Sequence, residues 1–282
     1  MYNAKFVSSN GKTFNFGYES GNIFDISGLT GFNVAIATSQ GFSQIGETVE
    51  NQSVGSQIFN ITGKLFKNVV ELKNKMLSTF VPFTSGRLYF NERFFIDCFV
   101  QKTPTIQIGN KIPKFTLQLF APYPFWQSVS KNSFVFGGYT PAFSFPVNYA
   151  QPHKFGIKSD SMFLNCYNGG TVEANYTLKI RTSTYLKNPS IINAQSQEFL
   201  ALQGEINAGE ELTVYKVENR LRVELLVNGV IVDVFSWLDE DSTLFSIHVG
   251  DNIIRATAEE GEENMIASIS FNDTVVSVYE EL

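Results

Sequence analysis

Short runs in which apolar and polar residues alternate recur along most of this chain of 282 residues. Successive side chains of a β-strand point to opposite faces, so each run predicts a strand with one buried and one exposed face. The turn Asn91-Glu92-Arg93 separates two of these runs and predicts a hairpin. In the first half the predicted strands are residues 4–7, 13–16, 33–38, 56–64, 87–90, 94–100 and 114–120.

Residues 67–80 break this alternation. Their apolar residues recur at spacings of three and four, which predicts an amphipathic helix over about 68–80 that packs on a sheet. Asn68 and Glu71 have the spacing of a capping box at its start, and Pro82 ends it. The residues that define the apolar face are Val69, Leu72, Met76 and Phe80.

Residues 39–55 form a polar stretch in which glycines and scattered apolar residues follow no period. A loop of this length inside a compact domain is either functional or wrongly assigned. We interpret it as an arm that reaches a neighbouring subunit, and the alternatives are a mobile loop or an ordinary hairpin. The apolar residues expected to make the contact are Phe42, Ile45, Val49 and Val54.

The second half predicts an antiparallel β-sandwich with one solvated face per sheet. Residues 171–182 alternate cleanly. Asn228-Gly229, between apolar runs, is a strong signal for a two-residue hairpin turn, because both central residues of a type I′ turn need positive φ. Asn272-Asp273 predicts a second such turn, between strands at 265–271 and 274–279.

The length fits two domains, and the predicted boundary follows a proline-rich run. Each proline in residues 121–126 removes a backbone donor, so this run ends the first domain, and residues 131–146 read as the linker. The prediction is a mainly β protein. Residues 1–133 form a β-sandwich-like domain with one helix, and residues 134–282 form an antiparallel β-sandwich.

Charge divides unevenly between these halves. Residues 1–133 carry 12 Lys+Arg and 7 Asp+Glu, a net of +5, and the remainder carries 9 and 20, a net of −11. Opposite charge favours ordered stacking of subunits, and the alternative is that the acidic half only confers solubility. No basic run interleaved with aromatics indicates nucleic-acid binding, and neither a membrane span of about 18 apolar residues nor a signal peptide is expected.

Residues that could carry chemistry are few. Cys98 and Cys166 lie far apart without metal-ligand spacing, which predicts two buried free thiols. His153 and His248 have no metal-spaced or catalytic partners, so a structural role is expected for both. No nucleotide motif surrounds Gly169-Gly170. The sequence therefore predicts no enzyme and no cofactor.

Two further features have alternative interpretations. The acidic clusters at 239–241 and 259–263 could supply the two carboxylates of a glycosidase or bind calcium, but acidic turns between strands usually serve solubility. Trp237, beside Ser236 and Asp239, is a candidate sugar contact in a carbohydrate-binding module, and the alternative is a structural core tryptophan.

Taken in order along nearly the whole chain, these features resemble the distal tail protein family of long-tailed, siphovirus-type bacteriophages. In the first half the resemblance rests on the short strands, the single helix, residues 86–90, and residues 115–126, an alternating strand that runs into a proline-aromatic segment. The family often places a Trp shortly before its Gly-Asp-Asn landmark, where this chain has Phe245. The landmarks of the second half are Asn168-Gly169-Gly170-Thr171, Asn188-Pro189-Ser190-Ile191, Leu212 after residues 208–211, and the segment from Ser246 through Val249-Gly250-Asp251-Asn252-Ile253-Ile254.

The resemblance implies a structural protein of the virion. It implies a ring, generally of six copies, at the tail tip, with the tail tube on one side and a tail-associated lysin or other baseplate hub protein on the other. The first domain would form the ring, and the second, a galectin-like or jelly-roll sandwich, would project outwards. Assembly in the host cytoplasm is expected, and the host, the receptor and a lytic, prophage or bacteriocin origin stay open.

Overall fold

The structure, a computed structural model, describes residues 2–107, 109, 111–137, 139–141, 156–158, 163–217 and 220–278. It divides into two compact units, the first made of Met1–Val129 with Val275–Leu282 and the second of Ser130–Thr274. The chain therefore returns to the first unit at its C-terminal end. With this division the first unit carries 11 Lys+Arg and 9 Asp+Glu and the second 10 and 18, so the net charges are +2 and −8.

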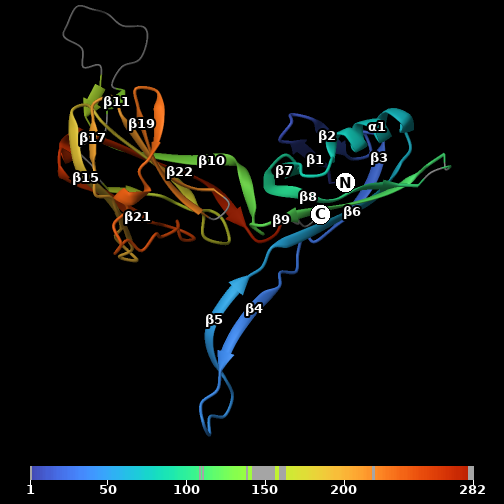
Figure 1. Cartoon of the computed structure of the whole chain (residues 1–282), viewed down its shortest axis with the longest axis horizontal. Coiled ribbons are helices and arrows are strands. Elements are labelled where there is room, and N and C mark those ends of the chain that lie inside the picture. The colour runs from blue at the N-terminus through green and yellow to red at the C-terminus, as the bar shows by residue number, and fades with distance from the viewer. Residues whose placement is uncertain are drawn as a thin grey trace, which may run out of the picture. The chain divides into compact units, whose positions relative to one another are not determined.

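The first unit is a set of antiparallel strands around an aromatic core (Figure 1). Strand β8 pairs with β7 and with β9. From β7 the sheet continues through β1 to β2, and from β9 it continues through β6 to β3. Six phenylalanines and Trp126 from these strands and the adjoining segments are almost completely buried, and their stacked and edge-on contacts fill the core. The strands are β1 (Ala4–Ser8), β2 (Thr13–Phe16), β3 (Asn22–Ser27), β6 (Gln57–Leu65), β7 (Ser85–Phe90), β8 (Phe94–Ile106) and β9 (Lys114–Ala121).

The single α-helix of the described residues, α1 (Val69–Thr79), lies where the sequence predicts it. It buries Met76 and Thr79 against the strands, as its apolar period requires. The predicted capping box is wrong. Asn68 adopts a left-handed conformation with φ 46° and makes no side-chain capping hydrogen bond, because a capping side chain needs the extended backbone of an ordinary N-cap.

The predicted turn between β7 and β8 is confirmed. Asn91 and Glu92 both have positive φ, and Phe90 pairs with Phe94 across the hairpin. Strand β3 was not predicted. Its alternation is obscured because Ile23 is exposed while Asn22 is buried and hydrogen-bonds the neighbouring backbone.

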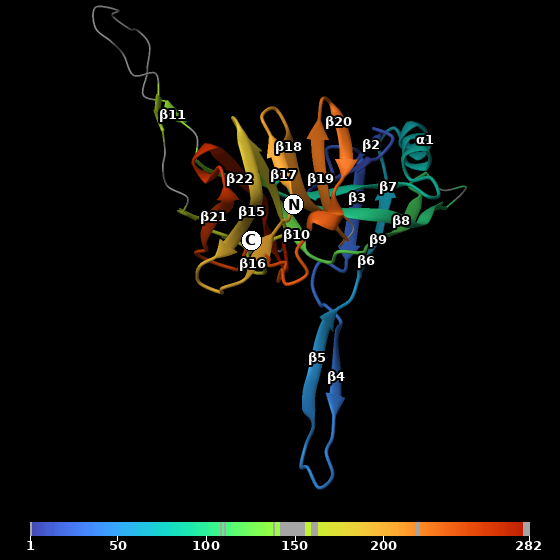
Figure 2. The same ribbon diagram turned by 60° about the vertical axis from the view of Figure 1, so that its left-hand side comes forward.

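The stretch at residues 39–55 is not a loop. It contains strand β5 (Thr48–Val54), which pairs antiparallel with β4 (Val34–Ser39) in a separate two-stranded ribbon. Figures 1 and 2 show this ribbon projecting from the rest of the first unit. Of the alternatives, the structure therefore shows a long hairpin. We call this hairpin, residues 33–56, the arm.

The second unit is a sandwich of two antiparallel sheets that share one core. One sheet has the order β10-β22-β14-β18-β19-β20, and the other has β13-β21-β15-β16 with β17 also paired to β15. A short ribbon pairs β11 with β12. The strands are β10 (Trp126–Phe136), β11 (Tyr139–Pro141), β12 (Gly156–Lys158), β13 (Phe163–Asn165), β14 (Tyr176–Thr182), β15 (Tyr185–Asn193), β16 (Phe199–Ala201), β17 (Glu205–Asn207), β18 (Glu211–Val217), β19 (Arg220–Val227), β20 (Val230–Asp233), β21 (Ile253–Glu260) and β22 (Met265–Val275), with 3-10 turns η1 (Phe235–Trp237) and η2 (Glu262–Asn264).

The mainly β, antiparallel prediction is thus confirmed, as is the Asn228-Gly229 turn, where both residues have positive φ. Two local predictions are wrong. The first part of the predicted linker is strand β10, and residues 142–146 lie outside the described residues. The turn at Asn272-Asp273 is absent because β22 runs straight through it, and Asp273 accepts hydrogen bonds from Asn132 Nδ2 and Gly169 N instead of closing a turn.

Among the described residues, no helix has the length and apolar character needed to cross a membrane.

Candidate functional site

The arm is amphipathic although all of it faces solvent. Cross-strand partners project to the same face of a ribbon, and Val34 pairs with Val54 while Thr38 pairs with Val49. Three valines and Ile36 therefore share one face of the ribbon with Thr38 and with Gln52, the partner of Ile36. The opposite face carries only small or polar residues, which are Ala35, Ala37, Ser39, Thr48, Asn51 and Ser53.

Every side chain of residues 33–56 is exposed. Phe42 and Ile45, at the tip, have exposed fractions of 103% and 102%, so neither touches the rest of the chain appreciably. An isolated two-stranded hairpin is at best marginally stable in water, and clustered exposed apolar side chains mark interaction surfaces. These properties agree with the predicted contact role of the arm, which stays a prediction.

The base of the arm is fixed to the first unit. Leu29 is buried, and the ring of Phe32 packs on Phe125, with ring centroids 5.6 Å apart. Tyr123 packs edge-on against the same Phe125 ring, at 5.5 Å. The proline-aromatic segment that carries the family resemblance thus anchors the point where the arm leaves the sheet.

Charge on the arm has one sign. Its ionisable residues are Glu47 and Glu50, and it contains no Lys or Arg. Glu50 also accepts a hydrogen bond from the Ser39 hydroxyl across the ribbon. An acidic, apolar ribbon favours a partner surface that combines lysine or arginine with exposed apolar groups.

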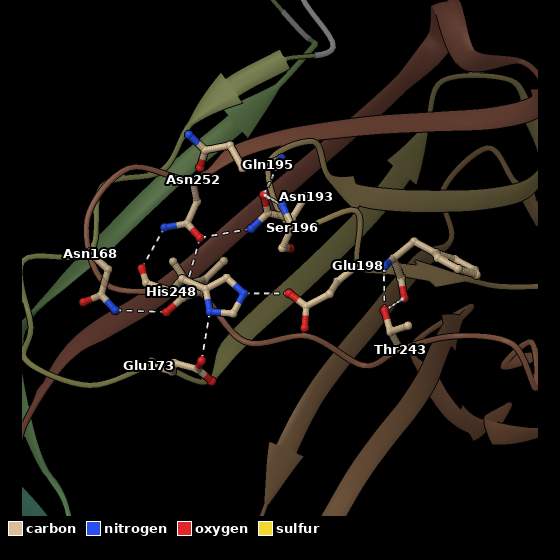
Figure 3. Close-up of polar contacts among 11 residues, drawn as sticks. Asn168, Glu173, Asn193, Gln195, Ser196, Glu198, Thr243, His248 and Asn252 are labelled. Carbon is tan, nitrogen blue, oxygen red and sulfur yellow. Dashed lines mark hydrogen bonds and ion pairs between the residues drawn. The ribbon is translucent and has the colours of Figure 1, made fainter.

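A second polar feature, in the second unit, surrounds His248 (Figure 3). The ring nitrogens of His248 contact two carboxylates, Nδ1 to Glu173 at 2.9 Å and Nε2 to Glu198 at 2.6 Å. The hydrogen bond to Glu198 is the main cause that raises the pKa of His248, and Glu173 adds to it. The pKa of Glu198 is lowered by its hydrogen bond with Ser196 and then by that with His248.

Buried asparagines continue this network inwards. Asn252 Oδ1 accepts from Asn193 Nδ2 and from the His248 backbone, while Asn252 Nδ2 donates to the Cys166 carbonyl. Asn168 pairs with Gly250 through both backbone groups and donates from its side chain to the Ile247 carbonyl. The second-half landmarks at 168–171 and 246–254 are therefore brought together by backbone hydrogen bonding, which explains their residue types without any catalytic role.

These contacts agree with the predicted structural role of His248, because its ring joins three segments of the chain. Its carboxylate partners could not be predicted, since they lie 75 and 50 residues away in sequence. His153 lies outside the described residues. Phe245, at the expected Trp landmark, is buried and packs on the Tyr176 ring at 5.3 Å.

Trp237 is partly buried and not fully exposed to solvent. Its indole packs against the core of the second unit and lies over Gly204, where an added Cβ would come within 2.2 Å of the ring. Asp239 hydrogen-bonds the Asp241 backbone and the Gln203 side chain, so this acidic cluster organises a turn. Glu259 contacts Lys187 and Asn188 on a neighbouring strand. Sugar binding at Trp237 stays a prediction.

The two cysteines are buried and free, as predicted. Within the described part of the chain, no group of three or more His, Cys, Asp or Glu residues could hold a metal ion. What the sequence missed in the candidate site is Val34 and Ile36, which complete the apolar face of the arm. Their run was recognised as a strand, but its partner strand was not.

Comparison with known proteins identifies one domain of the chain. Residues 169–274 match the model of the siphovirus-type tail component, C-terminal domain. The second unit therefore carries a domain of the siphovirus-type tail component family, in agreement with the resemblance to distal tail proteins. No curated protein matches the sequence significantly.

Similarity in fold extends beyond the matched domain. The crystal structure of phage SPP1 Dit, described as a paradigm of the hub adsorption apparatus of phages that infect Gram-positive bacteria, has a TM-score of 0.65 at 12% identity. The alignment covers 97% of this chain and 99% of that one, so both units share the fold. A chain of the phage P2 baseplate in its activated conformation with Ca is also similar, at TM-score 0.49 and 10% identity over 99% of this chain and 100% of that one.

Proposed function

We propose that this chain is a distal tail protein of a siphovirus-type phage. It assembles into a ring at the tail tip, which links the tail tube to the tail-associated lysin or baseplate hub for host adsorption. The observation that carries the proposal is the arm, a fully exposed ribbon that carries four aliphatic side chains on one face, on an otherwise well-packed unit. A ring of identical subunits needs two unlike patches per copy that meet around a closed rotation. The arm supplies one of them.

The size of the interface follows from general limits. A stable contact between two subunits buries on the order of 1,200 Å² or more in total, which is more than an apolar tip alone supplies. Both strands of the arm are therefore expected to be covered in the ring. The family resemblance sets the expected number of copies at six and places assembly in the host cytoplasm. The similarity to SPP1 Dit supports a hub role during adsorption.

The test removes the arm without disturbing its base. Gly55 N donates to the Asn33 carbonyl at 3.2 Å, so the two strands are close enough there to be joined by a short turn. Residues 34–54 are replaced by Gly-Gly, and mass is measured by light scattering for the wild-type and armless proteins, alone and mixed with the tail tube protein. Rings are expected only with the arm, and negative-stain electron microscopy shows their symmetry. Equal masses for both proteins in both conditions contradict the proposal.

A second candidate function, sugar binding by the second unit, has one observation in its favour. Phe235, next to Trp237, has an exposed fraction of 49%, and exposed aromatic faces can stack on pyranose rings. Binding to cell-wall glycans that is lost on Trp237→Ala, with the fold retained, supports this role. An unchanged glycan profile excludes Trp237 as the contact.

A further inference from the structure

Strand β13 and the residues that follow it form an edge of one sheet of the second unit, beside strand β21, which is labelled in Figure 2. The antiparallel register continues past the end of β13, because Cys166 and Asn252 exchange two backbone hydrogen bonds. Alternate residues of both segments are exposed, and the residues between them are buried or partly buried. The exposed residues form three cross-strand pairs in this register, which are Phe163 with Arg255, Asn165 with Ile253, and Tyr167 with Asp251. We call the surface made of these six residues the β13–β21 face.

Two aromatic rings mark the ends of the β13–β21 face. Phe163 and Tyr167 have exposed fractions of 50% and 59%, and they point to the same side because an even number of residues separates their positions along the strand. A strand rises about 3.3 Å per residue, so the two positions are about 13 Å apart. This distance is longer than one sugar ring and fits a ligand that extends along the strand.

The polar groups of this face are held by contacts with their neighbours. Arg255 lies over the Phe163 ring, with its guanidinium carbon 5.3 Å from the ring centroid. Asn165 Nδ2 donates a hydrogen bond to Asp251 Oδ1 at 2.7 Å. An amide and a carboxylate each have further hydrogen-bonding capacity beyond that single bond, so both can also bind a ligand. Planar groups of this kind form pairs of hydrogen bonds, as neighbouring hydroxyls of a sugar require.

Polar and apolar groups alternate on the β13–β21 face both along and across the strands. Each aromatic ring has a charged residue as its cross-strand partner, and Asn165 lies beside Ile253. A protein interface instead concentrates apolar groups at its centre and places charged groups at its rim. A pyranose has apolar C–H faces and a rim of hydroxyls, so it fits a surface on which aromatic rings and planar polar groups alternate.

The charges of this face are balanced. It contains one acidic residue, Asp251, and one basic residue, Arg255, within a unit whose net charge is −8. An acidic unit repels a polyanion, and a single arginine does not offset that repulsion. An uncharged ligand is therefore favoured over a nucleic acid or a phosphate-bearing polymer.

We infer that the β13–β21 face binds a neutral oligosaccharide. The rings of Phe163 and Tyr167 stack on sugar units along the strand. Asn165 and Asp251 hydrogen-bond the hydroxyls between them, and Arg255 hydrogen-bonds those at one end. The inference rests on the sugar-binding role proposed above for the second unit, and it assigns the contact to this face instead of to the tryptophan of η1.

Isothermal titration calorimetry with the full chain tests the ligand class. The probes are linear neutral hexasaccharides of glucose, galactose and N-acetylglucosamine, and poly(glycerol phosphate) is the charged comparison. At least one neutral probe is expected to bind, and to bind more tightly than the charged polymer. Absence of binding to every neutral probe, or tighter binding to the charged polymer, overturns the inference.

An aromatic substitution tests the location of the site. Tyr167→Ala is expected to weaken binding of the neutral probe at least about fivefold, because one stacked ring is lost. Tyr167→Phe keeps the ring and should retain most of the affinity. Tyr18→Ala is the matched control, because Tyr18 lies in the first unit with nearly the same exposed fraction, 58%, and should leave binding unchanged. Equal affinities of the Tyr167→Ala and wild-type proteins overturn the inference.

A polar substitution tests the hydrogen bonds separately from the stacking. Asn165→Leu replaces an exposed side chain by one of similar size, so the fold should be retained, and the midpoint of thermal unfolding checks this. The change removes hydrogen-bonding capacity from the middle of the face and is expected to weaken binding about fivefold. Unchanged affinity contradicts the contact between the polar groups and the sugar.

Failure of this inference is distinguishable from failure of the proposed functions. If Trp237→Ala abolishes binding and the variants of the β13–β21 face do not, the sugar-binding role stands and the face is wrong. If no neutral probe binds, the sugar-binding role fails together with the face. The armless protein should bind the neutral probe as tightly as the wild type, so the outcome of the ring experiment does not decide this one.

Discussion

His248 has two carboxylate partners, and this makes its contribution to stability dependent on pH. Its folded-state pKa is raised, so its contribution is complete below the unfolded value of about 6.5 and is lost as pH rises through the folded pKa. The pKa of Glu198 is lowered, so its contribution is present above about 4.3 and is lost as pH falls through its folded pKa. The contact is therefore strongest between about pH 4.5 and 6.5.

His248→Gln should destabilise the second unit more at acidic than at alkaline pH. Because the ring is about one-third exposed, we expect a loss in the free energy of unfolding about 0.5–1 kcal/mol larger at pH 5.5 than at pH 9. Urea unfolding at the two pH values measures it. Glu173→Gln, which removes the more exposed partner, is the control and should cost less. A pH-independent loss would show that the ring acts only through packing.

The two thiols should be inert in the folded protein. Burial raises the pKa of Cys98 to about 12 and that of Cys166 to about 12, so almost no thiolate exists at neutral pH. A thiol reagent such as DTNB should label neither residue in native buffer and both in denaturant. Labelling of one thiol under native conditions would indicate local opening around that residue.

At the scale of the element, the arm should be separable from the fold. No side chain of residues 33–56 is buried, so removing the ribbon takes no apolar group out of the core. The armless variant should therefore keep its free energy of unfolding within about 0.5 kcal/mol of the wild type. A larger loss, measured by urea titration of monomeric protein, would mean that the ribbon supports the first unit as well.

The base of the arm, by contrast, depends on a glycine. Gly28 has φ 96°, and a Cβ there would come within 2.3 Å of the Ile58 carbonyl oxygen. Gly31 has a similar φ of 84° but open space around it. Gly31→Ala should cost about 1–2 kcal/mol from backbone strain alone, and Gly28→Ala more, because the paired strand must also shift. Thermal unfolding of the two variants compares them, and equal losses would contradict a steric role for Gly28.

At the scale of the whole molecule, the C-terminal segment connects the end of the chain to the first unit. Val278 is buried in the core of that unit, although the preceding strand β22 belongs mainly to the second. The first unit is therefore complete only after the second has been synthesised. An interior made from both ends of the chain couples its stability to segments far apart in sequence.

Val278→Asp should destabilise the first unit selectively. A carboxylate replaces a buried aliphatic group, so a loss of about 2 kcal/mol or more is expected. Trp126 lies in the first core and Trp237 packs on the second, so fluorescence in a Trp237→Phe background reports the first unit alone. Ser277→Asp, at a partly exposed neighbour, is the control. Equal effects of both changes would argue against burial as the cause.

The sequence by itself determined the elements whose signals are local. Period-two runs, the face of α1, and the turns at Asn91-Glu92 and Asn228-Gly229 depend on neighbours within a few residues, and all were predicted from them. The same local logic failed at Asn68 and at Asn272-Asp273. There the backbone conformation, or a partner such as Asn132 at 141 residues' separation, outweighs the preference of the residue itself.

The tertiary structure alone decided what depends on partners distant in sequence. Strand β5 is polar enough to read as a loop, and only its pairing with β4 gives it regular structure and turns four aliphatic side chains to one face. The His248 network and the return of Val278 likewise join segments that no local pattern relates. Side-chain alternation is a property of a single strand, whereas a binding face needs the register between strands, which is set by long-range hydrogen bonds.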